Sequence, residues 1–133
     1  MLTEQDFKDG QILLIDKPLH WTSFQAVNKL RWLIKKTFKI KKIKVGHAGT
    51  LDPLATGLLI ICTGKFTKKI EELQGQIKEY TGTITLGATT PSYDLETEVD
   101  QTFDIDHITE QAILNTTKVH RAMRRMFGGL WGK

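Results

Sequence analysis

A glycine-rich segment, "GHAGTLDPLATG" at residues 46–57, combines the side chains in this chain that are best suited to chemistry. It contains one acid, Asp52, and one histidine, His47. A carboxylate held on such a loop can be a nucleophile, a general base, a metal ligand or a helix cap. Pro53 keeps Asp52 out of the helical region, and an Asp-Pro pair is more often only a structural turn. The loop alone leaves these interpretations open.

Two other kinds of site do not fit these residues. A phosphate-binding P-loop requires G-x-x-x-x-G-K-[ST], but Gly64-Lys65 is followed by Phe66, and no glycine lies six positions before Lys65. A metal site needs more ligands than His47 and Asp52, and no second histidine or cysteine lies at ligand spacing. We therefore expect neither a P-loop nor a metal site.

The segments before the loop have clear strand and helix patterns. Residues 11–18 are typical of a short buried strand, which ends at Pro18 because proline cannot continue a ladder. Residues 21–38 have apolar side chains at helical spacing, with Thr22 or Ser23 as the N-cap. The side chains expected on the buried face are Phe24, Val27, Leu30, Ile34 and Phe38.

After the loop the patterns alternate between apolar or β-branched runs and helix formers. The expected elements are strands at 58–64 and 79–90 and helices at 65–75 and 108–119. Thr109 is the expected cap of the last helix. This order predicts a mixed α/β or α+β domain.

Bulk properties limit the class of protein. A chain of 133 residues can bury one core, and its single cysteine, Cys62, excludes an intramolecular disulfide. Cys62 is expected to be a small buried apolar side chain. No apolar run reaches about 18 residues, so we expect no membrane segment and a cytoplasmic protein.

Charge is segregated along the chain. Residues 29–44 contain eight Lys or Arg residues and no acid, whereas residues 94–110 contain seven acids and no Lys or Arg. The net charge of +4 comes from residues 120–133, because the rest of the chain has equal numbers of acids and bases. The basic run is either a solvated helix face or a surface that attracts a polyanion.

The sequence around Asp52 resembles the signature of a known family. "VGHAGTLDPLATGLLIICTGKFTK" is similar, almost position for position, to the TruB family of tRNA pseudouridine synthases. The resemblance extends to "GQILLIDKPLHWTSFQAVNKLR" upstream and "KEYTGTITLGATTPSYDLETEV" downstream, from about Gly10 to Lys118. It implies the pseudouridine synthase fold, an α+β fold with a mixed, mainly antiparallel sheet and flanking helices.

The resemblance also implies an activity. Members of the family isomerise the T-loop uridine, at tRNA position 55, to pseudouridine, and the aspartate of G-T-L-D-P is catalytic, which assigns that role to Asp52. No cofactor is implied. The uridine must leave the RNA stack, at a cost of roughly a few kcal/mol. The expected partner is the tRNA T-arm, bound by a monomer without an obligate protein partner or a membrane.

Further substrate-binding residues are implied by the same motifs. His47 is expected beside the flipped nucleotide, although a hydrogen bond within its own loop is the alternative. Tyr80 matches the tyrosine that stacks on the target base, and otherwise would pack as a strand residue. Lys17 and Lys78 match basic positions, where phosphate contact and ion pairing are both open. Asp94 matches an acid that either positions a partner or simply forms a turn.

The sequence departs from the family pattern in three places, one of which is Pro91-Ser92, where an Asp-Thr pair is usual. His20 stands where many members have glycine. More seriously, the resemblance stops before "HRAMRRMFGGLWGK" at residues 120–133, a basic tail typical of a shifted reading frame. We expect residues 1–119 to be the N-terminal portion of a truncated catalytic domain, without the family's partner arginine or its PUA domain. A non-catalytic RNA-binding fragment and an inactive truncated product are the alternatives to an active enzyme.

Overall fold

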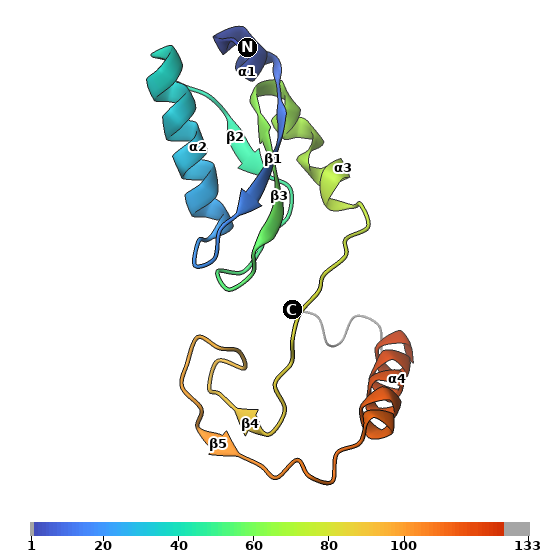
Figure 1. Ribbon diagram of the computed structural model, residues 1–133. Helices are drawn as coiled ribbons and strands as arrows, with labels where there is room; N and C mark the ends of the chain where they lie inside the picture. Colours follow the sequence, from blue (N-terminus) through green and yellow to red (C-terminus); the bar gives the residue numbers. More distant parts are fainter. Residues whose placement is uncertain (1, 127–133) are drawn as a thin grey trace. The chain divides into compact units, whose positions relative to one another are not determined.

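The computed structural model describes residues 2–126, with side chains described up to residue 118 (Figure 1). The chain forms two units, Met1–Thr81 and Gly82–Lys133. None of the helices in the described part of the chain is both long enough and apolar enough to span a membrane.

The first unit is a small antiparallel sheet with helices around it (Figure 1). The sheet has the order β1-β3-β2, and β3 pairs antiparallel with both neighbours. Its elements are α1 (Glu4–Asp9), β1 (Ile12–Lys17), α2 (Ser23–Phe38), β2 (Val45–His47), β3 (Gly57–Thr63), the 3-10 helix η1 (Gly64–Lys69) and α3 (Ile70–Gln74). The predicted α+β class is confirmed, as are the strand at 11–18, the helix at 21–38 and the strand at 58–64.

Helix α2 begins where its sequence predicts. The Thr22 hydroxyl accepts a hydrogen bond from the Gln25 N–H at 3.1 Å, and the Gln25 side chain accepts one from the Thr22 N–H at 2.8 Å. This capping box satisfies two N–H groups that the first turn would otherwise leave unpaired. Thr22, rather than Ser23, is therefore the N-cap.

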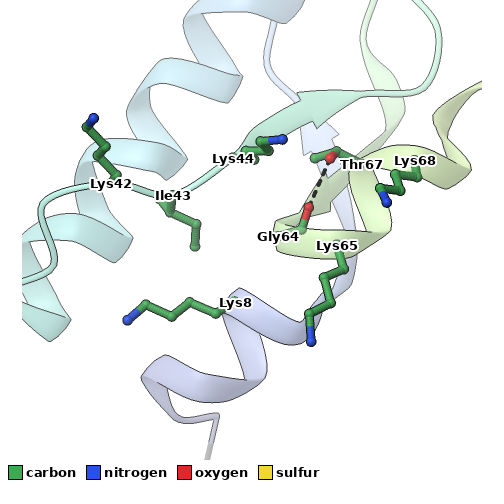
Figure 2. A pocket seen from close by; sticks show the side chains of 8 residues that line it. All are labelled: Lys8, Lys42, Ile43, Lys44, Gly64, Lys65, Thr67 and Lys68. Atoms are coloured by element: carbon green, nitrogen blue, oxygen red, sulfur yellow. Dashed lines mark hydrogen bonds between the residues drawn. The ribbon is translucent and has the colours of Figure 1, made fainter.

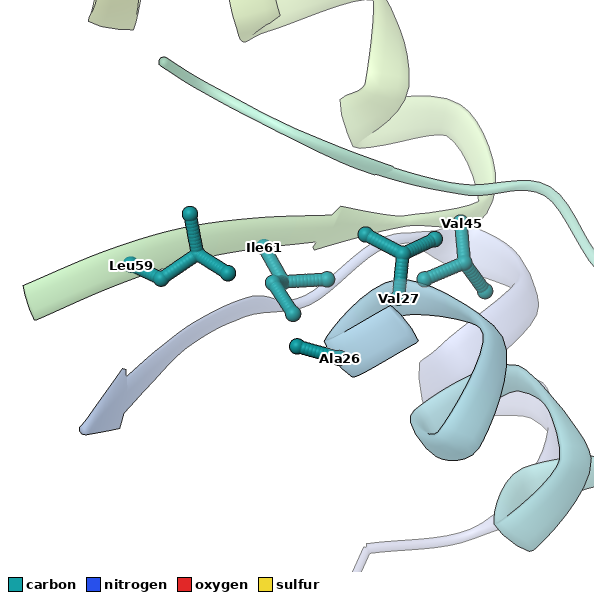
Figure 3. Packing of buried hydrophobic residues seen from close by; sticks show 5 residues of the cluster. All are labelled: Ala26, Val27, Val45, Leu59 and Ile61. Carbon is teal, nitrogen blue, oxygen red and sulfur yellow. The ribbon is translucent and has the colours of Figure 1, made fainter. Parts of the chain in front are cut away.

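The core lies between α2 and the sheet. Figure 3 shows Ala26 and Val27 of the helix packed against strand residues, and the full cluster is Ala26, Val27, Val45, Leu59 and Ile61. Cys62 is also buried, as predicted, and this burial raises the pKa of its thiol. The predicted buried face of the helix is wrong at Phe24, whose side chain is 63% exposed. Phe24 lies roughly a quarter turn from the middle of the buried face on a helix of 3.6 residues per turn.

Two elements of the first unit were not predicted. Helix α1 starts with a capping box between Thr3 and Asp6, and β2 lies where the basic run at 29–44 meets the glycine-rich segment at 46–57. The helix predicted at 65–75 divides into η1 and the short α3.

The second unit contains little regular structure. Its elements are β4 (Ala88–Thr89), paired antiparallel with β5 (Gln101–Thr102), and helix α4 (Glu110–Met126). The strand predicted at 79–90 is therefore wrong except for its last residues, and Ile84 is exposed. A β-branched run without a pairing partner does not form a ladder.

Helix α4 begins at the predicted cap. The Ala112 N–H donates to the Thr109 hydroxyl at 3.2 Å. The helix extends beyond the predicted end at residue 119 to Met126, so it includes the first part of the predicted tail. The last part of that tail, residues 127–133, lies outside the described residues.

Candidate active site

Asp52 lies in the connection between β2 and β3, and the backbone on both sides of it is bonded to the start of α2 and to the turn before it. The Ser23 hydroxyl accepts a hydrogen bond from the Leu51 N–H at 2.9 Å and donates one to the Leu51 carbonyl at 3.2 Å. On the other side, the His20 N–H donates to the Pro53 carbonyl at 2.7 Å. Asp52 is thus held between two anchors that come from a segment about thirty residues earlier in the chain.

The Asp52 side chain itself is exposed. Its carbonyl accepts the Ala55 N–H at 3.0 Å, which closes a turn, and the next element is a strand, so Asp52 does not cap a helix. Among residues 2–118, no hydrogen bond or ion pair engages its carboxylate, and no cluster of three or more metal-ligating side chains is found. The carboxylate is therefore open to a ligand, on a backbone whose position is fixed.

One anchor requires an unusual backbone conformation. His20, where many relatives of the resembled family have glycine, has a φ of 63°, in the left-handed region. Glycine adopts this region without strain, which gives a physical reason for glycine at this position. His20 nevertheless adopts it and donates its N–H to the Asp52 loop.

His47 is bonded within its own loop. Its Nδ1 lies 2.6 Å from the Gly49 carbonyl oxygen, and the pairing of β2 continues past it through the Ala48 N–H and the Ile60 carbonyl at 2.8 Å. Because a carbonyl only accepts, Nδ1 carries the hydrogen, and Nε2 of the neutral ring remains an acceptor. The contact is the loop-internal alternative that the sequence left open. It fixes the ring and leaves one nitrogen for a ligand.

Lys17 has an internal role in the described structure. Its side chain is fully buried, and Nζ donates to the carbonyls of Pro18 at 3.0 Å and Trp21 at 2.6 Å. These bonds stabilise the turn between β1 and α2, which carries one anchor of the Asp52 loop, His20, and leads into the other, Ser23. Lys17 thus acts on this loop through the turn. Because its side chain is buried, the structure does not support a direct contact with phosphate.

Lys78 and Tyr80 lie on the extended chain after α3. The Lys78 ammonium donates to the carbonyls of Gln74 and Gln76, the latter at 2.9 Å. A methyl group at Gly49 would lie 3.8 Å from the Lys78 Cε, so Lys78 lies beside the turn that holds His47. Tyr80 is 69% exposed and belongs to no strand, so the alternative in which it packs into the core is wrong.

Asp94 belongs to the second unit and forms a turn. Its carboxylate accepts hydrogen bonds from the Ser92 hydroxyl at 2.6 Å and the Glu96 N–H at 2.9 Å. The Ser92 bond, and then the Glu96 bond, lower the pKa of Asp94 from its ordinary value. The structure therefore supports the turn interpretation of this acid.

Ser23 is a residue whose role the sequence did not indicate. From the sequence it is only an alternative helix cap, because its contact with Leu51 spans 28 positions and has no local signal. We expect Ser23→Ala to reduce the free energy of unfolding by about 1–3 kcal/mol, since the Leu51 N–H would lose its partner. Hydrogen exchange would show faster exchange at the Leu51 amide relative to the Ile61 amide.

Thr22→Ala is the matched control for this substitution. It removes the helix cap, at a cost of about 1 kcal/mol, but leaves the Leu51 anchor in place. Equal acceleration at Leu51 in both variants would contradict the anchoring role of Ser23.

Comparison with known proteins identifies the family. The model of the TruB family pseudouridylate synthase (N terminal domain) matches residues 35–125. The tRNA pseudouridine synthase B of Flavobacterium johnsoniae is 70% identical over 118 residues, covering 88% of this chain and 52% of that protein. The protein of the same name from Phocaeicola vulgatus is 57% identical over 123 residues, 92% of this chain and 50% of its own.

The chain spans about half the length of the curated relatives it matches. A more distant relative, the tRNA pseudouridine synthase B of Chloroherpeton thalassium, is 51% identical over 120 residues, 90% of this chain and 46% of its own length. The family model covers well over half of the chain and includes the whole Asp52 loop. The protein therefore belongs to the TruB family of pseudouridylate synthases.

Proposed function

We propose that residues 1–119 are the N-terminal portion of the catalytic domain of a tRNA pseudouridine synthase, which isomerises the T-loop uridine with Asp52 as its catalytic carboxylate. The observation that carries this proposal is the Asp52 loop, exposed at its carboxylate and anchored on both sides by Ser23 and His20. The names of the relatives support the substrate, since each is called a tRNA pseudouridine synthase B.

The chemistry suits an unengaged carboxylate. The N1–C1′ bond of uridine breaks, the base turns, and a C5–C1′ bond forms, while the proton lost from C5 is balanced by one gained at N1. A carboxylate can add covalently and leave again, so it can carry such a reaction without a redox partner. Because the backbone is anchored on both sides of Asp52, its carboxylate is held with the positional precision that the reaction needs.

The other candidate side chains have complementary roles in this proposal. The Nε2 of His47 accepts a hydrogen bond from the flipped nucleotide, and Lys78 contacts its phosphate from beside the same turn. Tyr80 stacks on the uracil ring, for which an exposed aromatic side chain is suited. Lys17 positions the loop through the β1–α2 turn, and Asp94 orders its own turn in the second unit.

The test of the proposal uses a chimera, because the chain spans only about half the length of its relatives. Residues 1–118 would be joined to the part of the Flavobacterium johnsoniae protein that follows its matched segment. We expect this chimera to release tritium from C5 of the T-loop uridine in a T-arm stem-loop. A stem-loop with cytidine in place of that uridine is the control, and absence of release from the uridine substrate would contradict the proposal.

A non-catalytic RNA-binding fragment is the second candidate. Helix α2 favours it, because Trp32 is exposed there and the ammonium groups of Lys29 and Lys36 lie 5.0 and 4.7 Å from its ring. Basic side chains around an exposed aromatic ring are suited to RNA. This candidate predicts salt-dependent RNA binding by the 133-residue chain without any release of tritium by the chimera.

A further inference from the structure

Five lysines from three segments surround one hollow in the first unit. Lys8 comes from α1, Lys42 and Lys44 from the segment before β2, and Lys65 and Lys68 from η1 (Figure 2). The hollow has a volume of about 360 Å³. We call it the lysine pocket, and its other lining residues are Ile43, Gly64 and Thr67.

The walls of the lysine pocket are fixed relative to one another. Gly64 has a φ of 52°, and a Cβ there would lie 2.1 Å from the Lys8 carbonyl oxygen, so the backbones of α1 and η1 meet where a side chain cannot fit. The Gly64 N–H donates to the Lys44 carbonyl at 2.9 Å. The buried Thr63 hydroxyl donates to the Phe7 carbonyl at 2.9 Å. The lysines therefore extend from a rigid frame.

Two of the five lysines are paired with acids. Lys8 forms an ion pair with Glu4, and Lys65 lies 2.7 Å from an oxygen of Asp9. Within the part of the chain whose side chains are described, no ion pair involves Lys42, Lys44 or Lys68. Like charges gathered on a rigid frame repel one another, and an anion in the pocket relieves that repulsion.

The arrangement fits several phosphates better than one. Figure 2 shows the five ammonium groups spread around the pocket instead of converging on a single point, with Ile43 between them. The pocket adjoins Gly64 at the end of β3, whereas the Asp52 loop leads into the start of β3 at Gly57. A seven-residue strand places these two ends roughly 20 Å apart. An RNA that contacts both would span at least this distance.

We propose that the lysine pocket binds backbone phosphates of an RNA, as a contact separate from the Asp52 loop. The inference rests on the proposed function for the RNA class and adds a second region of contact. The basic run at 29–44 therefore has two parts. Lys42 and Lys44 line the pocket, whereas Lys29, Lys35 and Lys36 lie on the exposed face of α2.

The test compares two triple variants of the full 133-residue chain. The pocket variant carries Lys42→Gln, Lys44→Gln and Lys68→Gln. The matched control carries Lys35→Gln, Lys39→Gln and Lys118→Gln, none of which lines the pocket or lies over the Trp32 ring. All six side chains are exposed, so both variants lose three charges without loss of buried contacts. The measurement is the affinity for a T-arm stem-loop as a function of salt concentration, after circular dichroism has shown unchanged folding.

Affinity for RNA decreases with salt, so the slope of log affinity against log salt is negative. We expect the magnitude of this slope to decrease by about 2–3 in the pocket variant and by less than about 1 in the control. The pocket variant should also bind RNA at least about tenfold more weakly at low salt. A loss in the pocket variant no larger than that in the control would overturn the proposal.

Two further measurements distinguish RNA from an acidic protein as the ligand, and binding at the pocket from catalysis at Asp52. Poly-glutamate would be measured alongside the RNA, and a larger pocket-dependent loss for poly-glutamate would overturn the proposal in favour of an acidic protein partner. Pocket-dependent RNA binding together with a chimera that forms no pseudouridine would support the pocket and contradict the proposed function. The two proposals can therefore fail independently.

Discussion

Replacing Asp52 with asparagine will reduce the single-turnover rate of pseudouridine formation by at least about 10³-fold in the chimera of residues 1–118 with the Flavobacterium johnsoniae protein. Asparagine keeps the size of the side chain but is neither a nucleophile nor a base of useful strength. The loop should keep its conformation, because its anchors use the backbone of Leu51 and Pro53 and not the Asp52 carboxylate. Tritium release from C5 measures the rate, and filter binding measures the affinity for the T-arm.

Asp106→Asn is the control for this substitution. It removes the same charge from an exposed aspartate in the second unit, and no hydrogen bond engages the Asp106 carboxylate among the described side chains. We expect its rate to stay within about twofold of the unsubstituted chimera, since surface changes of this kind have small effects. An Asp52→Asn chimera with a comparable rate would contradict the catalytic role of Asp52.

The largest effect on stability is expected at Ile61. Ile61→Ala should lower the free energy of unfolding by about 2–5 kcal/mol, because it removes buried methyl groups and leaves a cavity. The side chain is 0% exposed, and its strand position lies opposite Leu13 of β1 and His47 of β2. Its loss therefore loosens the strand that joins both edges of the sheet. Denaturant unfolding followed by tryptophan fluorescence measures the change.

Leu58→Ala provides the comparison within the same strand. Leu58 is 62% exposed, so its truncation removes little buried surface and should cost less than about 1 kcal/mol. Equal costs at Leu58 and Ile61 would show that the packing between α2 and the sheet does not determine the stability of this unit.

The elements that the sequence predicted correctly have local causes. Helix α2 follows from its apolar spacing and its Thr22–Gln25 capping box, and β1 ends at Lys17 because Pro18 follows it. The errors concern features that depend on distant partners. Residues 79–90 have strand composition but pair only at Ala88–Thr89, and β2 is recognisable only through its pairing with β3.

The residues of the candidate site likewise fall into those that the sequence could indicate and those that depend on distant partners. Asp52, His47 and Tyr80 were identified from their types and from the resemblance to a family, which requires no knowledge of contacts. The anchors of the Asp52 loop, Ser23 and His20, have no such signal, because their partners lie far along the chain.

By itself, the sequence determined the α+β class, the family and the residues whose side chains could take part in a reaction. Composition, periodicity and motif are properties of neighbouring positions, so they can be read without a structure. Only the tertiary structure decided which side chains share a surface. Lys42 and Lys44 belong to the same basic run as Lys29 and Lys36, yet pairing of β2 with β3 places them beside Lys68. The physical reason is that strand pairing and close approach at Gly64 join segments whose charges no local pattern relates.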